Sequence, residues 1–194
     1  METSLKETLS EEERNILLSV AREAITAAVA RRSLPALQIE KQPQILQADG
    51  ATFITLTKNG HLRGCIGTME PYQPLIADVQ EHAVAAALSD YRFPKVTQDE
   101  LGQIRIEISR LTPLKRLPYK ETEELVKALR IGVDGVLIRN EGRRATFLPQ
   151  VWEQLPQPDQ FLSQLCLKMG APADLWKTKS MEVFTYQVEK FKEE

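Results

Sequence analysis

The dipeptide Asn59-Gly60 narrows the choice of fold for this chain more than any other feature. A type I′ turn needs two successive residues with positive φ, and Asn-Gly is among the pairs that best supply them. Residues 52–57, just before the turn, are rich in the β-branched and aromatic residues that favour strands. The sequence therefore predicts a β-hairpin whose second strand runs from about His61 to Cys65, where glycines interrupt it.

Three other segments have strand patterns. In residues 103–111, isoleucines occupy one face, while Glu107 and Ser109 lie on the other, which indicates a strand with one buried face. A second hairpin is predicted around residues 140–142, where a glycine closes a polar turn. A final strand is expected at residues 181–188.

Four segments have helical patterns. Ser10 followed by Glu13 is a capping box, and it opens an amphipathic helix. Further helices are expected after Pro74, at residues 121–130 and at residues 159–169, and the helix after Pro74 is thin because it is rich in alanine. About six strands and four helices without regular βαβ alternation predict an α+β fold, in which helices pack on an antiparallel or mixed sheet.

The chain has 194 residues, short loops and no repeat or linker, so one domain spanning residues 1–194 is expected. Disorder is predicted only at residues 1–9 and 190–194. The net charge of −2 favours neither nucleic acid nor an anionic membrane. No signal peptide and no apolar run of about 18 residues is recognisable, so we expect a cytoplasmic protein with reduced cysteines and no membrane segment.

Cys65 is the residue most suited to chemistry. Gly64 and Gly67 allow the backbone to turn sharply and approach a ligand, and successive N–H groups in such a turn can bind an anion. Arg63 adds positive charge, which lowers a thiol pKa. The run therefore suggests a nucleophilic thiolate beside an oxyanion pocket. The alternative is that Cys65 is a small buried hydrophobe and the glycines are packing space.

Several polar residues are candidate partners for Cys65. His82 is a candidate base on a helix, or else a structural or surface histidine. Glu107 is a candidate base, metal ligand or arginine partner if its strand face meets Cys65, and surface decoration if that face meets solvent. Asp90 and Arg92 form a second polar cluster, which caps the backbone or binds a ligand.

Neither a metal site nor a cofactor is predicted. The two cysteines and two histidines lack metal-type spacing. Residues 132–135 form a turn rather than a phosphate-binding loop, because the Lys-Ser/Thr ending is missing. Trp152 and Trp176 are interpreted as core residues.

The run Leu62-Arg63-Gly64-Cys65-Ile66-Gly67 resembles the hallmark of the AMMECR domain family. Other segments agree with the family in order and spacing: Asp90-Tyr91-Arg92-Phe93-Pro94, Glu107-Ile108-Ser109, Gly132-Val133-Asp134-Gly135 and Thr146-Phe147-Leu148-Pro149-Gln150-Val151. The similarity covers nearly the whole chain. It implies an α+β fold with a mainly antiparallel sheet and a smaller second lobe, and it strengthens a functional role for Cys65, Arg63, Gly64, Gly67, Asp90 and Arg92.

The resemblance also implies a cellular setting. Prokaryotic members look like component A of the AmmeMemoRadiSam system, whose other components are a Memo-like protein, similar to metal-dependent extradiol dioxygenases, and a radical-SAM protein. One hypothesis is an enzyme that uses Cys65 as nucleophile or redox thiol on an unknown small molecule, with Glu107 or His82 moving protons. Another is a non-enzymatic binding partner of those two proteins. A third is a metal or small-molecule carrier using Cys65, His82 and Glu107.

Overall fold

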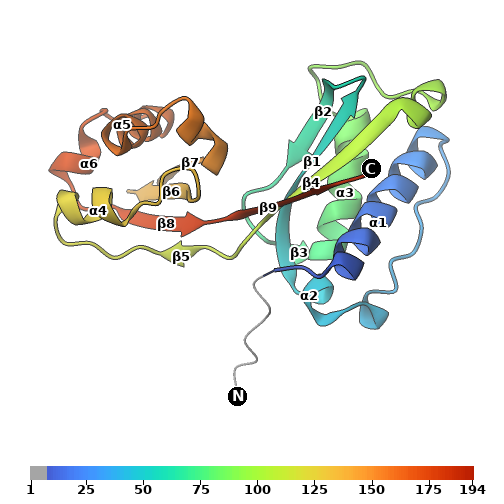
Figure 1. The fold of residues 1–194 in the computed structure, drawn as a ribbon, viewed down its shortest axis with the longest axis horizontal. Coiled ribbons are helices and arrows are strands. Elements are labelled where there is room, and N and C mark those ends of the chain that lie inside the picture. Colours follow the sequence, from blue (N-terminus) through green and yellow to red (C-terminus); the bar gives the residue numbers. More distant parts are fainter. Residues whose placement is uncertain (1–7) are drawn as a thin grey trace. The chain divides into compact units, whose positions relative to one another are not determined.

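The computed structural model describes residues 8–194, and these form two units, each with its own sheet and core (Figure 1). Unit 1 comprises the described residues up to Thr112 together with Glu189–Glu194, and the smaller unit 2 is Pro113–Val188. The predicted α+β fold, with helices packed on a mainly antiparallel sheet and a smaller second lobe, is confirmed, and the second lobe has an antiparallel sheet of its own. That residues 1–194 form one domain stays a prediction.

The sheet of unit 1 is built around the predicted hairpin. Its strands, in the order β2-β1-β4-β9, are β2 (His61–Gly67), β1 (Asp49–Lys58), β4 (Ile104–Leu111) and β9 (Val188–Lys192), and the short β3 (Gln73–Pro74) also pairs with β1. Asn59 and Gly60 have φ angles of 51° and 80°, as a type I′ turn requires. β2 continues through its glycines to Gly67 and does not stop at Cys65, so the hallmark run is a strand and not a sharply turned loop.

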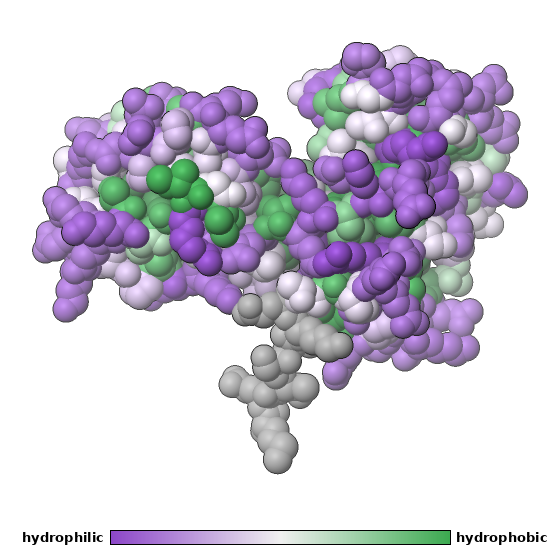
Figure 2. All heavy atoms as spheres, viewed as in Figure 1, coloured by the Kyte–Doolittle hydropathy of each residue, from purple (hydrophilic) through white to green (hydrophobic). Residues whose placement is uncertain are grey.

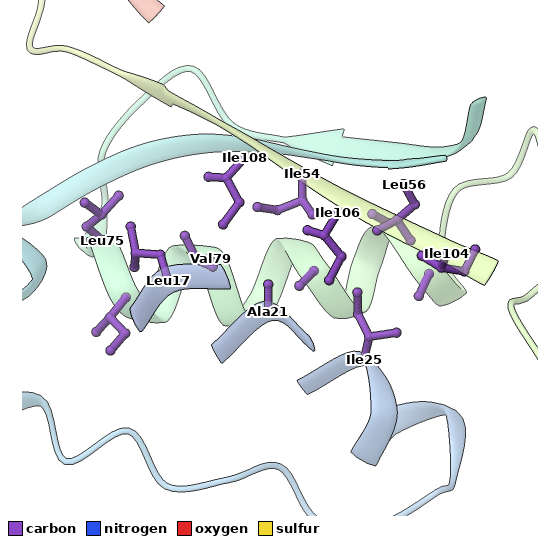
Figure 3. Close-up of a cluster of buried hydrophobic side chains, with 14 of the residues drawn as sticks. Leu17, Ala21, Ile25, Ile54, Leu56, Leu75, Val79, Ile104, Ile106 and Ile108 are labelled. Carbon is purple, nitrogen blue, oxygen red and sulfur yellow. The ribbon is translucent and has the colours of Figure 1, made fainter. Parts of the chain in front are cut away.

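Two long helices cover one face of this sheet. They are α1 (Glu11–Val29) and α3 (Leu75–Leu88), accompanied by the short elements α2 (Gln44–Gln47), η1 (Ile39–Lys41) and η2 (Gln98–Gln103). The capping box of Ser10 and Glu13 is present at the start of α1. The core between helices and sheet contains Leu17, Ala21, Ile25, Ile54, Leu56, Leu75, Val79, Ile104, Ile106 and Ile108 (Figure 3). The helices thus bury every second residue of the central strands and leave the others on the opposite face.

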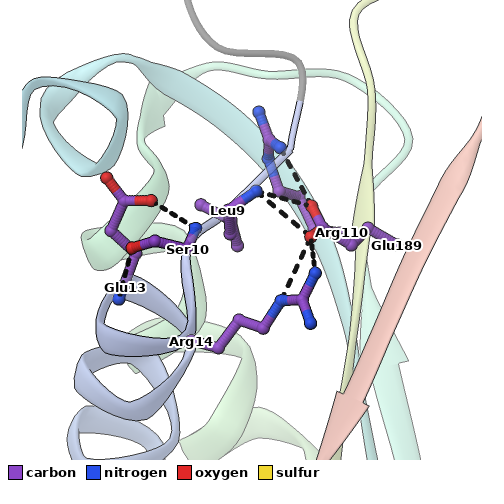
Figure 4. Close-up of polar contacts among 6 residues, drawn as sticks. All are labelled: Leu9, Ser10, Glu13, Arg14, Arg110 and Glu189. Carbon is purple, nitrogen blue, oxygen red and sulfur yellow. Dashed lines mark hydrogen bonds and ion pairs between the residues drawn. The ribbon is translucent and has the colours of Figure 1, made fainter.

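The C-terminal segment, whose residues 190–194 were predicted to be disordered, forms β9 and makes specific contacts with the rest of unit 1. Glu193 forms an ion pair with Arg22 of α1 and accepts the backbone N–H of Ile106. The carboxylate of Glu189 accepts hydrogen bonds from three groups near the start of α1 and on β4: the N–H of Leu9, Arg14 and Arg110 (Figure 4). These partly buried, charge-assisted bonds hold β9 on the sheet, a long-range effect that local composition does not reveal. Residues 1–7 of the predicted N-terminal disorder lie outside the described residues.

Unit 2 packs helices on a second antiparallel sheet. The strands, in the order β5-β8-β6-β7, are β5 (Lys115–Arg116), β8 (Glu182–Tyr186), β6 (Gly135–Asn140) and β7 (Arg143–Phe147). The helices are α4 (Thr122–Ala128), η3 (Pro149–Glu153), α5 (Pro158–Lys168) and α6 (Leu175–Thr178). Trp152 and Trp176 are both 2% exposed, and Trp152 stacks on Phe161 with ring centroids 3.7 Å apart. Their predicted role as core residues is confirmed.

The surface is mainly polar. Figure 2 shows hydrophilic residues over most of the face it presents, with hydrophobic residues exposed on unit 2. The exposed large apolar side chains of that unit are Ile131, Val133 and Leu167. Among residues 8–194, no helix has the length and apolar character needed to span a membrane.

Candidate functional site

Cys65 lies on β2, at the edge of the unit 1 sheet, where its backbone groups have no neighbouring strand. Two side chains from the segment after α3 take the place of that strand. The Cys65 N–H donates to Asp90 Oδ2 over 2.8 Å, and Arg92 Nη2 donates to the Cys65 carbonyl over 3.2 Å. The pair therefore blocks the open edge at this residue.

Asp90 and Arg92 are also bound to each other. Arg92 Nη2 lies 2.7 Å from Asp90 Oδ2, and Arg92 Nε lies 2.9 Å from Asp90 Oδ1. Asp90 is 5% exposed, and the Arg92 guanidinium, helped by the Cys65 N–H, holds the pKa of its carboxyl well below the usual range. Asp90 thus stays ionised and acts as a fixed acceptor for the strand edge. The Arg92 side chain is 45% exposed, so part of its guanidinium faces solvent.

Arg63 is the extra residue of a β-bulge. The pairing of β1 with β2 steps from Thr57 opposite Leu62 to Leu56 opposite Gly64, which leaves Arg63 without an opposite residue. Its guanidinium instead bonds both oxygens of Glu100, at 3.0 and 3.1 Å, and the carbonyls of Pro94 and Lys95. Four of its five donor hydrogens are thereby engaged within unit 1, and Arg63 anchors η2 and the segment after α3 to β2.

Both glycines of the hallmark are required by close packing. A Cβ on Gly64 would lie 2.2 Å from the carbonyl oxygen of Ala86, because α3 rests directly on the strand. A Cβ on Gly67 would lie 2.2 Å from the carbonyl oxygen of Thr52 and 2.5 Å from the Cα of Phe53. Neither glycine is among the residues with positive φ. Their role is to give space to neighbouring backbone, as the packing alternative predicted, and no turn of N–H groups forms at Cys65.

The Cys65 side chain lies on the sheet face opposite α1 and α3, in a row with two other polar residues. Cys65 is opposite Thr55 on β1, and Thr55 is opposite Glu107 on β4. The sulfur lies 3.4 Å from Thr55 Oγ1, and all three side chains are half-buried. The contact is close because the backbone groups of Cys65 point outward, which makes Cys65 and Thr55 a non-hydrogen-bonded pair. We call this row the Cys65 row.

Glu107 is the least constrained member of the Cys65 row. Within the described part of the chain, its carboxylate has no hydrogen-bond or ion-pair partner. A half-buried carboxylate in this position remains able to accept a proton or a ligand donor.

His82 lies on the other side of the sheet. Its Nδ1 is 3.2 Å from Asp78 Oδ1, and Asp78 Oδ2 accepts a hydrogen bond of 2.6 Å from Thr52. Thr52 and Thr55 are three residues apart on one strand, so their side chains point to opposite faces, and the sheet separates His82 from Cys65.

Asp78 is a buried ionisable residue that the sequence analysis did not single out. Its side chain is fully buried. The sequence signal that could have revealed it is the spacing of Asp78 and His82, which lie one helical turn apart and can therefore pair. Burial alone lowers the pKa of His82, but the hydrogen bond and charge of Asp78 outweigh it and raise that pKa above its ordinary value. Asp78 and His82 thus form a buried ion pair within α3 when His82 is protonated, and the bond from Thr52 to Asp78 links α3 to β1.

Comparison with known proteins decides the family. The family model described as AMMECR1 matches residues 18–191. The chain belongs to the AMMECR1 family. Protein MK0488 of Methanopyrus kandleri is 36% identical over 97% of this chain and 92% of its own length, and protein MJ0810 of Methanocaldococcus jannaschii is 35% identical over 80% and 79%. The crystal structure of uncharacterized protein PH0010 from Pyrococcus horikoshii matches with a TM-score of 0.79 and 29% identity, covering 96% of this chain and 94% of that one.

The residues of the run Leu62–Gly67, and the two side chains that bind its backbone, therefore have distinct structural tasks. Arg63, Asp90 and Arg92 hold the edge strand, and the glycines admit neighbouring backbone. The Cys65 side chain takes part neither in holding the edge strand nor in admitting neighbouring backbone. The structure brings Cys65 and Glu107 into one row but not His82, and within residues 8–194 no three His, Cys, Asp or Glu side chains are grouped so as to hold a metal ion.

Proposed function

We propose that this AMMECR1 protein is an enzyme that uses the Cys65 thiol as a nucleophile, with its substrate on the sheet face that carries the Cys65 row. The observation that carries the proposal is the contact of 3.4 Å between Cys65 Sγ and Thr55 Oγ1, with the unpartnered carboxylate of Glu107 next in the same row. A nucleophile followed in space by a hydroxyl group and then a carboxylate can pass its proton away as it attacks.

The proposed step is nucleophilic attack on an electrophilic carbon. As the S–C bond forms, the thiol proton passes through the Thr55 hydroxyl to the Glu107 carboxylate, and the electron pair of the broken bond at carbon leaves with the leaving group or moves onto its oxygen. Glu107 then returns the proton to that group. The exposed part of the Arg92 guanidinium offers donors to an anionic portion of the substrate.

The experiment is alkylation of Cys65 by iodoacetamide across the pH range. Cys166 is fully buried and burial raises the pKa of its thiol, so its replacement by serine removes the second thiol without removing a reactive group. In a Cys166→Ser background, Cys65 is expected to react faster than free cysteine at neutral pH. Glu107→Gln and Thr55→Val are expected to slow the reaction, whereas Glu12→Gln, an exposed residue on α1, leaves it unchanged. Reaction no faster than that of free cysteine would refute the nucleophile.

A second candidate function is a binding role without catalysis, with Memo-like and radical-SAM proteins as partners. It is favoured by one observation: the side chains of Arg63 and Asp90 are engaged in making β2 rigid, while Leu62 and Tyr91 beside them are 45% and 94% exposed. Rigid, exposed apolar and aromatic side chains are typical anchors of protein interfaces.

The two functions are separable by mutation. If the edge is a docking surface, Leu62→Ser and Tyr91→Ala weaken co-purification with a Memo-like or radical-SAM partner, and Cys65→Ser does not. Leu167→Ser is the matched control, since Leu167 is 50% exposed on unit 2. Absence of any complex at micromolar concentration would argue against the binding role.

A further inference from the structure

Unit 2 contains a cavity of about 440 Å³ that has no part in the proposed thiol site. It is lined by the end of the β6–β7 hairpin, residues 139–144, and by residues 180–182. The hairpin supplies three arginines to the lining within six residues: Arg139, Arg143 and Arg144. A volume of several hundred Å³ is in the range of small-molecule sites.

The arginines are placed where their charges repel. Arg139 lies directly opposite Arg144 across the antiparallel pair, and like charges in such positions destabilise a sheet. Other contacts hold two of the guanidiniums in position: Arg139 lies over the ring of Phe184, 5.0 Å from its centroid, and Arg143 bonds the carbonyl of Gly170 over 2.7 Å. The fold thus keeps positive charge together at one end of the hairpin.

Each of the two acidic residues of the lining also forms an ion pair with a basic residue outside the lining. Glu141 pairs with Lys179 at 3.1 Å, and Glu182, which lies opposite Arg139 on β8, is also 3.7 Å from Arg116. The lining has one more positive than negative charge, and each of its carboxylates also pairs with a cation outside it. The local field around the cavity is therefore positive.

An unsatisfied donor in the lining points to the same kind of ligand. The side-chain nitrogen of Asn140 is buried and has no hydrogen-bond partner in the described part of the chain. Buried amide groups are normally hydrogen-bonded, so an unsatisfied amide nitrogen in a cavity wall is suited to donate to a bound acceptor. Asn140 thus adds a neutral donor to the guanidiniums of the lining, and groups of both kinds bind acceptor atoms.

We propose that this cavity binds a small anion with several phosphate or carboxylate groups. Such a ligand relieves the repulsion between Arg139 and Arg144, accepts the hydrogen bond of Asn140, and matches the fork geometry of guanidinium groups. The site is independent of Cys65, since all its residues belong to unit 2.

The test is calorimetric titration of the intact protein with pyrophosphate and, separately, with citrate, in a buffer of low ionic strength. The informative variant is Arg144→Glu, which places an acid opposite Arg139. It is expected to weaken binding roughly tenfold or more, while the temperature of unfolding without ligand is unchanged or higher, because repulsion becomes attraction. Asn140→Ala, which removes only the amide, is expected to weaken binding several-fold. Arg32→Glu is the control, because it makes the same change of charge at an exposed position on unit 1.

Binding of pyrophosphate alone assigns the site to phosphate groups, and binding of citrate alone assigns it to carboxylates. The proposal is overturned if neither probe binds at millimolar concentration. It is also overturned if Arg32→Glu weakens binding as much as Arg144→Glu, because the effect is then one of net charge and not of this cavity.

Discussion

Substitution of Gly64 by alanine tests the close contact between α3 and β2. The added Cβ would lie 2.2 Å from the Ala86 oxygen, whereas ordinary contacts begin at 3.4 Å, so helix and strand must separate by about 1.2 Å. No side-chain rotation relieves the clash, because the atom belongs to the backbone. Overpacking of this kind costs about 1–3 kcal/mol, and the cost here is expected at the upper end, about 3 kcal/mol, because separation also loosens Ala83 and Ala87.

The assay is equilibrium unfolding in urea followed by far-ultraviolet circular dichroism, which reports on all helices and most strongly on the two longest, α1 and α3. Tryptophan fluorescence in the same samples reports on unit 2, since Trp152 and Trp176 both lie there. Gly102→Ala is the control: a Cβ on Gly102 meets no atom within 4 Å, and its φ is not positive. That variant is expected to stay within about 0.5 kcal/mol of the parent protein or to be slightly more stable.

Equal stability of Gly64→Ala and Gly102→Ala would contradict the close contact between α3 and β2. A result of this kind would mean that α3 does not rest on the strand as closely as described. The hallmark glycine would then need an explanation other than packing.

Two further predictions concern pH. The pKa of Asp90 is lower in the folded than in the unfolded protein, so its carboxylate stabilises the fold fully above the ordinary carboxyl pKa of about 3.9 and loses this effect as the pH falls through the folded value. Asp90→Asn should therefore reduce the stability of the fold by about 2 kcal/mol at neutral pH and by less in acid. The temperature of unfolding, measured at neutral and at acid pH, checks this. An equal loss of stability at neutral and at acid pH would contradict the role of the Asp90 charge. Since the folded pKa of His82 is raised, the stabilisation from its pair with Asp78 is complete below about pH 6.5 and is lost as the pH rises through the folded value. The temperature of unfolding should fall over that range in the parent protein and stay flatter in His82→Gln, and parallel profiles would contradict the pair.

The elements of unit 1 that the sequence predicted are those with local causes. The turn at Asn59-Gly60 follows from the φ angles that these two residues tolerate. The thin helix follows from its alanines, three of which are buried against the sheet at positions 83, 86 and 87. Signals of this kind act over a few residues, so a sequence alone reveals them.

The arrangement of the candidate site depends on strand order, which is not local. Cys65 and Glu107 share a row only because β1 lies between β2 and β4 in a particular register. A shift of one residue would move Glu107 to the helix face. The same holds for His82, whose place on the far side of the sheet follows from the face that α3 covers. The spacing of these residues along the chain predicts neither the shared row of Cys65 and Glu107 nor the position of His82.

The bonds of Asp90 and Arg92 to the backbone of Cys65 distinguish the structural role of this backbone from any role of the Cys65 side chain. Asp90 and Arg92 bind the N–H and carbonyl of Cys65, and these groups are the same in every amino acid except proline. The edge of the sheet therefore does not need a thiol: serine at position 65 keeps both backbone bonds and is able to bond Thr55. What the fold leaves unexplained is the sulfur itself, half-buried on a face that the helices do not cover. The nucleophile that we propose gives the sulfur a task that the backbone bonds of Cys65 do not require.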